Sequence, residues 1–88
     1  MIAYRIVTTT SGEEWFDEAA AADAAVARRL GVDPLTIESR RRRVTADPVV
    51  VRRDGARWRS RQVWTVRSGE MNVRIYEMLK VDETAYDH

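Results

Sequence analysis

Arginines recur at every second position in the middle of this chain, where residues 56–67 read ARWRSRQVWTVR. Successive side chains of a β-strand point to opposite faces, so this stretch predicts a strand with tryptophans on one face and arginines on the other. The planar guanidinium of arginine binds phosphates and carboxylates through paired hydrogen bonds. The spacing therefore favours the binding of an anionic partner.

Residue types suited to catalysis or metal binding are sparse. His88 is the only histidine and the chain contains no cysteine, which excludes disulfides, thiolate chemistry and multi-histidine metal sites. The four glycines are scattered and form no phosphate-binding loop. Acidic pairs such as Glu13-Glu14 are typical of solvated turns. We expect no catalytic residue, metal or cofactor, and a protein that is not an enzyme.

Positive charge is concentrated in the middle of the chain. Residues 36–74 contain eleven arginines and four acidic residues, whereas residues 1–35 contain three arginines and six acidic residues. Residues 75–88 contain one lysine and four acidic residues. Fourteen of the fifteen Lys and Arg residues are arginines, an excess that GC-rich coding would also produce. The composition thus bears on the charge of a partner and not on the fold.

The arginines must be positioned by a small set of elements, of which a helix at residues 17–30 has the clearest signals. Asp17 is a suitable N-cap, Arg28 and Arg29 lie in the last turn, and Gly31 suits a left-handed stop. The alanines make this helix thin, so that it can lie close on a sheet.

Strands are expected before and after this helix. Residues 2–8 alternate apolar and polar side chains, and a short returning strand ends at Phe16. Residues 36–45 predict an edge strand that projects beyond the core, because two of its consecutive arginines would otherwise point inward. A short helix capped by Asp33, with Pro34 at its first position, is the competing interpretation.

A hairpin follows at residues 49–60. Its Asp-Gly pair at 54–55 suits a two-residue turn, which sets Val51 opposite Trp58 and Arg52 opposite Arg57. Like charges directly opposed destabilise a sheet, so a bound anion or neighbouring acids are expected to neutralise them.

A second two-residue turn is expected at residues 68–69. It sets Trp64 opposite Val73 and keeps the apolar side chains of three strands on one face. Glu77 interrupts the apolar alternation of the last strand. A bulge there, or an edge position beyond the end of the helix, would explain it.

Together these signals predict a single α+β domain over residues 1–88. We expect an antiparallel sheet of four to five strands, one alanine-rich helix packed on one face, and an acidic tail at 82–88 that is frayed. The opposite sheet face is expected to be open. The aromatic side chains expected in the core under the helix are Tyr4, Trp15, Phe16, Trp58 and Trp64.

The candidate binding site is the basic sheet face. Its residues are Arg52, Arg57, Arg59, Arg61, Arg67, Arg74 and Tyr76, with a secondary basic cluster at Arg40, Arg41, Arg42 and Arg43. Arginines on adjacent strands would form a plane that follows phosphates, and Tyr76 would add a stacking contact. The alternative is a solvated face partly paired with nearby acids.

Two kinds of partner fit this surface. Nucleic acid is the first, and an acidic protein surface is the second, as for a phage or mobile-element inhibitor that blocks a host nucleic-acid-targeting defence complex. A homodimer through an edge strand is also compatible with the sequence. The chain has no apolar run long enough to span a bilayer, and we expect no membrane partner and a cytoplasmic location.

Overall fold

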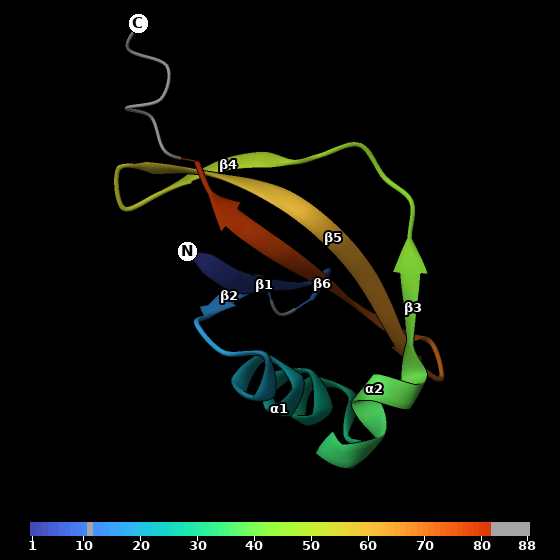
Figure 1. Cartoon of the computed structure of the whole chain (residues 1–88). Helices are drawn as coiled ribbons and strands as arrows, with labels where there is room; N and C mark the ends of the chain where they lie inside the picture. Colours follow the sequence, from blue (N-terminus) through green and yellow to red (C-terminus); the bar gives the residue numbers. More distant parts are fainter. Residues whose placement is uncertain (11, 82–88) are drawn as a thin grey trace, which may run out of the picture.

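The computed structural model describes residues 1–10 and 12–81 and forms an α+β domain (Figure 1). The predicted tail at 82–88 lies outside the described residues. The elements in chain order are β1 (Ile2–Thr8), β2 (Gly12–Phe16), α1 (Ala19–Leu30), the 3₁₀ helix η1 (Pro34–Thr36), α2 (Ile37–Arg40), β3 (Arg41–Val44), β4 (Val50–Arg53), β5 (Ala56–Ser68) and β6 (Met71–Lys80).

The strands form one antiparallel sheet in the order β2-β1-β6-β5-β3. The strand β4 also pairs with β5, on the edge that β3 uses. The predicted fold class is confirmed, and residues 1–10 and 12–81 contain six strands in place of four or five, together with a second, short helix. We call the side of the sheet on which α1 packs the helix face, and the other side the opposite face.

Turn chemistry explains the β4–β5 hairpin. Asp54 (φ 54°) and Gly55 (φ 77°) both adopt the left-handed conformation that a two-residue turn of type I′ requires. Val51 consequently pairs with Trp58, and Arg52 with Arg57, as the sequence predicts.

The β5–β6 turn is displaced by one residue from its predicted place. Ser68 pairs with Met71, so Gly69 and Glu70 form the turn and Trp64 lies opposite Ile75. Gly69 has a φ of 60° and supplies the left-handed first position of the turn, which explains the displacement.

The helix α1 begins two residues later than predicted. Residues 17–18 still form the bend that leads out of β2, so Glu18 and not Asp17 is the N-cap residue. Gly31 ends the helix as expected, with a left-handed φ of 68° and its N–H donating to the Ala27 carbonyl. The buried side chains of the helix are Ala22, Ala25, Val26, Ala27 and Leu30.

The strand predicted at residues 36–45 is correct only for its second half. Asp33 caps η1 by accepting from the Leu35 N–H, with Pro34 at the first position, so the competing helix is present. The chain continues into α2, which buries Ile37, and becomes extended at Arg41. The resulting strand β3 lies at the edge of the sheet, as predicted.

A β-bulge divides β5 at Arg61. The register with β6 shifts between Ser60 and Gln62, so Arg61 is an extra residue. Side-chain alternation is reversed across this point. Trp64 packs toward α1, whereas Trp58 belongs to a cluster on the opposite face. The prediction that both tryptophans share one face is therefore wrong.

The opposite face is not the open surface that the sequence suggests. It holds a second apolar cluster built on Ala3, Trp58, Val63, Tyr76 and Met78. The ring of Trp15 on β2 meets Trp58 edge-on at 5.5 Å, and Arg53 of β4 lies 4.7 Å from the centre of the Trp15 ring. Because β2 and β4 are far apart in the strand order, the sheet must curl to bring them together. The curl covers Trp15 and Trp58 without a helix.

Candidate functional site

The predicted basic face is split between the two faces of the sheet. Before the bulge, Arg57 and Arg59 lie on the helix face, since they alternate with Trp58 of the opposite-face cluster. After the bulge, Arg67 lies on the opposite face, where Arg74 also lies. The interpretation of one continuous arginine plane is therefore wrong, because the extra residue Arg61 inverts the alternation.

Tyr76 is not available as a stacking platform. Only 9% of its surface is exposed, and it belongs to the apolar cluster of the opposite face. The guanidinium of Arg5 lies 5.2 Å from the centre of its ring and covers it.

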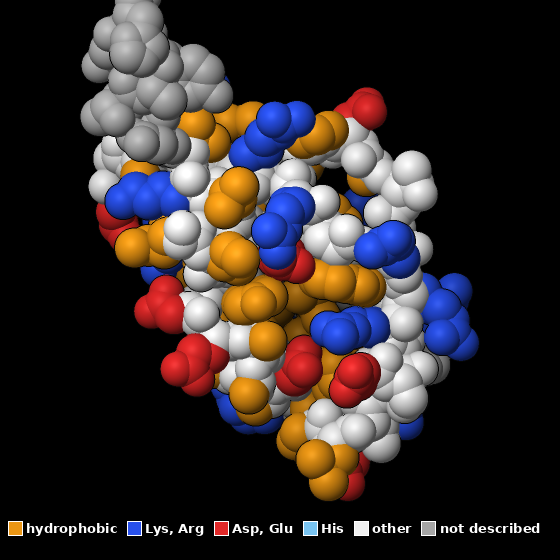
Figure 2. All heavy atoms as spheres, in the orientation of Figure 1, with side chains coloured by type: hydrophobic (Ala, Val, Ile, Leu, Met, Phe, Trp, Pro, Cys, Tyr) orange, Lys and Arg blue, Asp and Glu red, His pale blue; other side chains and the backbone are white. Residues whose placement is uncertain are grey.

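The helix face instead gathers a different set of arginines. Arg43 comes from β3, Arg57 and Arg59 come from β5, and Arg61 comes from the bulge. All four are exposed, and we call them the outer arginine surface. In Figure 2, Lys and Arg side chains lie mainly over β4, β5 and β3, whereas acidic side chains lie mainly at the lower left and around α1.

Apolar side chains are interleaved with these arginines. Val50 and Leu79 flank Arg59 on the neighbouring strands, and they are 51% and 40% exposed. Trp64, half-buried, lies opposite Arg43. The surface therefore combines cationic groups with apolar and aromatic ones.

The arginines of this surface differ in their partners. Arg61 forms an ion pair with Glu77, whose side chain is 11% exposed. Within residues 1–10 and 12–81, no acidic side chain lies within ion-pair distance of Arg57 or Arg59. Arg52 lies across from Arg57 on the same face. Two exposed guanidiniums are thus available to an external anion.

The bulge explains why Glu77 interrupts the apolar alternation of β6. It is one of the two explanations that the sequence allowed. Glu77 lies opposite Gln62, one residue after the bulge, and is buried on the helix face. A buried carboxylate needs a charged partner, and the extra residue Arg61 supplies it.

The four consecutive arginines of the secondary cluster have separate environments. Arg40 donates from Nε to the Thr36 hydroxyl at 2.9 Å and ends α2. Arg41 lies 4.8 Å from the centre of the Trp64 ring. Arg42 points to the opposite face, since it pairs with Thr65. Only Arg43 joins the outer arginine surface.

The neighbourhood of Arg41 includes acidic groups of the helices. Burial raises the pKa of Asp23 on α1 above its ordinary value, the Arg41 guanidinium opposes this, and the nearby Glu38 carboxylate adds to it. Arg41 therefore belongs to a local charge cluster and not to the exposed surface.

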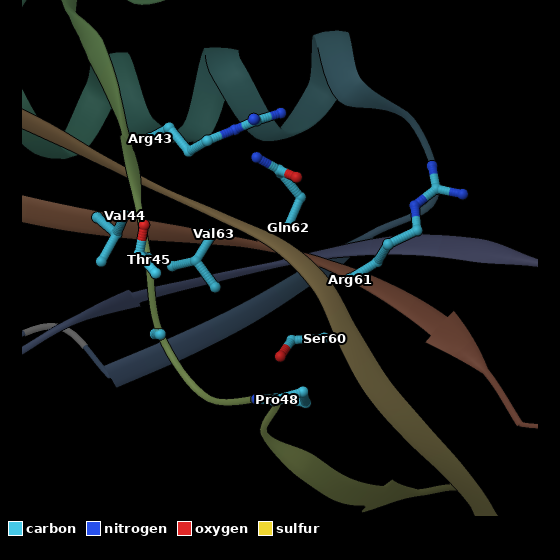
Figure 3. Close-up of a pocket in the computed structure, with 9 residues that line it drawn as sticks. Arg43, Val44, Thr45, Pro48, Ser60, Arg61, Gln62 and Val63 are labelled. Atoms are coloured by element: carbon cyan, nitrogen blue, oxygen red, sulfur yellow. The ribbon is translucent and has the colours of Figure 1, made fainter.

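A cleft opens beside the bulge (Figure 3). Val44 pairs with Val63, and Val50 pairs with Arg59. Residues 45–49, which connect β3 to β4, therefore lie opposite the shorter stretch 60–62 of β5. The connection between β3 and β4 is longer than the part of β5 that it faces, so it bows outward and leaves a space of about 220 Å³ between itself and β5. Figure 3 shows Arg43, Gln62 and Arg61 on the side toward α1, with Ser60 and Val63 on the other.

Gln62 and Arg43 face each other at this cleft. The Gln62 amide gains partners when its oxygen is turned toward the guanidinium, where it accepts from Arg43 Nε and, at 2.9 Å, from Arg43 Nη2. The amide nitrogen is then directed away from Arg43.

Sequence reasoning missed Gln62, Val50 and Leu79 as surface residues. Unbroken alternation along residues 56–67 places Gln62 on the same face as the tryptophans, which the sequence predicts to be buried. The misfit of Glu77 was the one signal of a bulge that could have placed these residues correctly.

Comparison with known proteins adds no identity. The chain matches no family model, no curated protein and no solved structure. Within residues 1–10 and 12–81 there is no group of three or more potential metal-ligating His, Cys, Asp or Glu residues. In the same part of the chain, no helix has the length and apolar character needed to cross a bilayer.

Proposed function

We propose that this protein is a non-catalytic cytoplasmic binding module that holds single-stranded nucleic acid on the outer arginine surface. The observation that carries the proposal is the pair Arg57 and Arg59, exposed and without an acidic partner in the described residues. Guanidiniums of this kind bind backbone phosphates and release counterions.

The interleaved apolar groups favour a single strand over a duplex. Val50 and Leu79 flank Arg59, and Trp64 lies half-buried farther along the same face. Apolar and aromatic side chains contact the faces of unpaired bases, which a duplex keeps stacked inside. Phosphates on arginines and bases on the apolar groups would use both components of the surface.

Fluorescence anisotropy with labelled DNA and RNA single strands and their duplexes tests the proposal. The native protein should bind single strands at low salt, with log K falling linearly as log salt rises. Arg57→Ala and Arg59→Ala should each lower the salt slope by about 1.

Arg74→Ala is the matched control, because Arg74 is equally exposed but lies on the opposite face. It should leave the salt slope unchanged. The proposal is wrong if no probe binds at low salt, or if Arg74→Ala and Arg59→Ala weaken binding equally.

A protein partner is the second candidate. The exposed Val50 and Leu79 beside Arg59 favour it, because interface centres combine apolar groups with arginine. Inhibition of a host nucleic-acid-targeting defence complex by a phage or mobile-element protein is one such role. A complex of this kind would depend less on salt, and one arginine would contribute more than its neighbours.

A further inference from the structure

Two irregularities of the sheet meet at residues 60–62. On the β6 side of β5, Arg61 is the extra residue of the bulge. On the other edge, the pairing of β5 passes from β4 to β3, and the connecting residues 45–48 bow away, whereas Val49 is hydrogen-bonded to Ser60. Bulges are enriched beside functional sites, where they redirect side chains. The coincidence of both irregularities opens a cleft next to the outer arginine surface.

The size of the cleft limits what can enter it. Its volume of about 220 Å³ is below the roughly 300–1,000 Å³ of pockets for drug-sized ligands. It lies at the sheet edge, between β5 and the segment that leads from β3 into β4 (Figure 3). One flat ring system fits such a space better than a larger cofactor does.

The lining of the cleft suits a flat heterocycle with polar edges. Val44, Val63 and Pro48 supply apolar walls, and the Thr45 hydroxyl and the Gln62 amide supply polar groups. Ser60 also lines the cleft, but its hydroxyl already accepts from the Val49 N–H at 2.8 Å. The Gln62 oxygen accepts from Arg43, so the Gln62 amide nitrogen and the Thr45 hydroxyl are left to recognise a ligand.

The charges around the cleft suit a ligand that carries phosphates. Arg43 and Arg61 both line it, and both point to the side toward α1 (Figure 3). Their known partners leave donors free: Arg61 meets Glu77 through Nη2, and its side chain is 56% exposed. A base in the cleft would thus have its flanking phosphates beside two cations.

We propose that the cleft between β5 and the β3–β4 connection seats one base of the bound single strand and reads it through Gln62 and Thr45. This inference rests on the proposed function and deepens it. The arginines give affinity that is independent of sequence, and the cleft adds a preference among bases. The Gln62 amide nitrogen, which is directed away from Arg43, can donate to a base edge, and the Thr45 hydroxyl beside it can donate or accept.

Oligothymidine probes with a single central A, C or G, together with unmodified oligothymidine, test the inference. The native protein should prefer one central base by at least about fivefold, the lower limit for a paired hydrogen-bond contact. Gln62→Leu keeps a similar size but removes both polar groups. It should abolish the preference and leave the salt slope unchanged.

Arg59→Ala is the matched variant, since Arg59 belongs to the arginine surface but does not line the cleft. It should lower the salt slope and retain the base preference. Equal binding of all four probes by the native protein would overturn the inference and leave the proposed function standing. Absence of binding to any probe would overturn both.

A second measurement covers the case in which Gln62→Leu does not fold. Amide resonances of the native protein are followed while the preferred probe is added. Those of Thr45 and Gln62 should shift together with that of Arg59. Shifts at Arg59 without shifts at Thr45 and Gln62 would overturn the inference.

Discussion

Arginines are used differently in two regions of this domain. Around β1, β2 and α1, Arg5 and Arg29 are paired with acidic side chains. Arg5 meets Glu13, and Arg29 donates to Glu14 Oε1 at 2.8 Å and to the Gly12 carbonyl at 2.9 Å. On the helix face of β5, Arg57 and Arg59 have no such acidic partner in the described part of the chain.

This difference separates structural arginines from candidates for binding. The Arg29 side chain is only 8% exposed, and it connects α1 to β1 and β2. A coding bias would supply arginine to both regions, but it does not explain why Arg5 and Arg29 have acidic partners whereas Arg57 and Arg59 have none in the described part of the chain. Composition alone cannot make this distinction, because it depends on which side chains the fold brings together.

The largest expected effect on stability concerns the contact between Trp15 of β2 and Trp58 of β5, which joins the two regions. Trp58→Ala removes a side chain that is 5% exposed and meets Trp15 across the curled sheet. We expect the free energy of unfolding to fall by about 3–5 kcal/mol, measured by urea denaturation. Trp64→Ala is the control, because Trp64 is half-buried on the helix face, and its loss should be smaller. Equal losses would contradict the importance of the Trp15–Trp58 contact.

The next largest expected effect distinguishes the two kinds of arginine by how much each contributes to the free energy of unfolding. Arg29→Ala removes a nearly buried side chain with hydrogen bonds to Thr8, Gly12 and Glu14, and should lower the free energy of unfolding by about 1–2 kcal/mol. Arg59→Ala removes an exposed side chain and should change it by less than about 0.5 kcal/mol. Denaturation curves recorded for both variants in one buffer make the comparison. A larger loss for Arg59→Ala would show that the outer arginine surface is structural.

The smallest expected effect concerns Asp23, on the side of α1 near β3. Since burial raises its pKa in the folded state, the folded protein binds more protons, and stability falls as pH rises from 3.8 through the raised value. Asp23→Asn should therefore stabilise the protein at neutral pH, by less than about 1 kcal/mol because the carboxyl is partly solvated. Below pH 3.8 the gain should vanish. A gain that persists in acid would point to a cause other than ionisation of Asp23.

Features set by local chemistry could be predicted from the sequence. The Asp54-Gly55 turn and the Gly31 helix stop depend on backbone conformations that few residues adopt. The edge position of β3 followed from its charges, since consecutive arginines cannot all be buried.

The division of the arginines could not be predicted in the same way. It depends on one extra residue, Arg61, whose neighbours carry no turn residue to mark a bulge. The only sign was Glu77, and two explanations of it remained open. The curl that buries Trp58 against Trp15 is likewise a property of the whole sheet and has no local signature.

The bulge at Arg61 also bears on how this sequence tolerates change in length. Loss of one residue there would restore unbroken alternation along β5. Trp58 would then turn toward the helix face, and Arg57 and Arg59 would enter the apolar cluster that now holds Trp58. Substitution of this exposed arginine is a local change, whereas its deletion exchanges the two sides of the strand. Related sequences should therefore keep the number of residues between Trp58 and Trp64 constant.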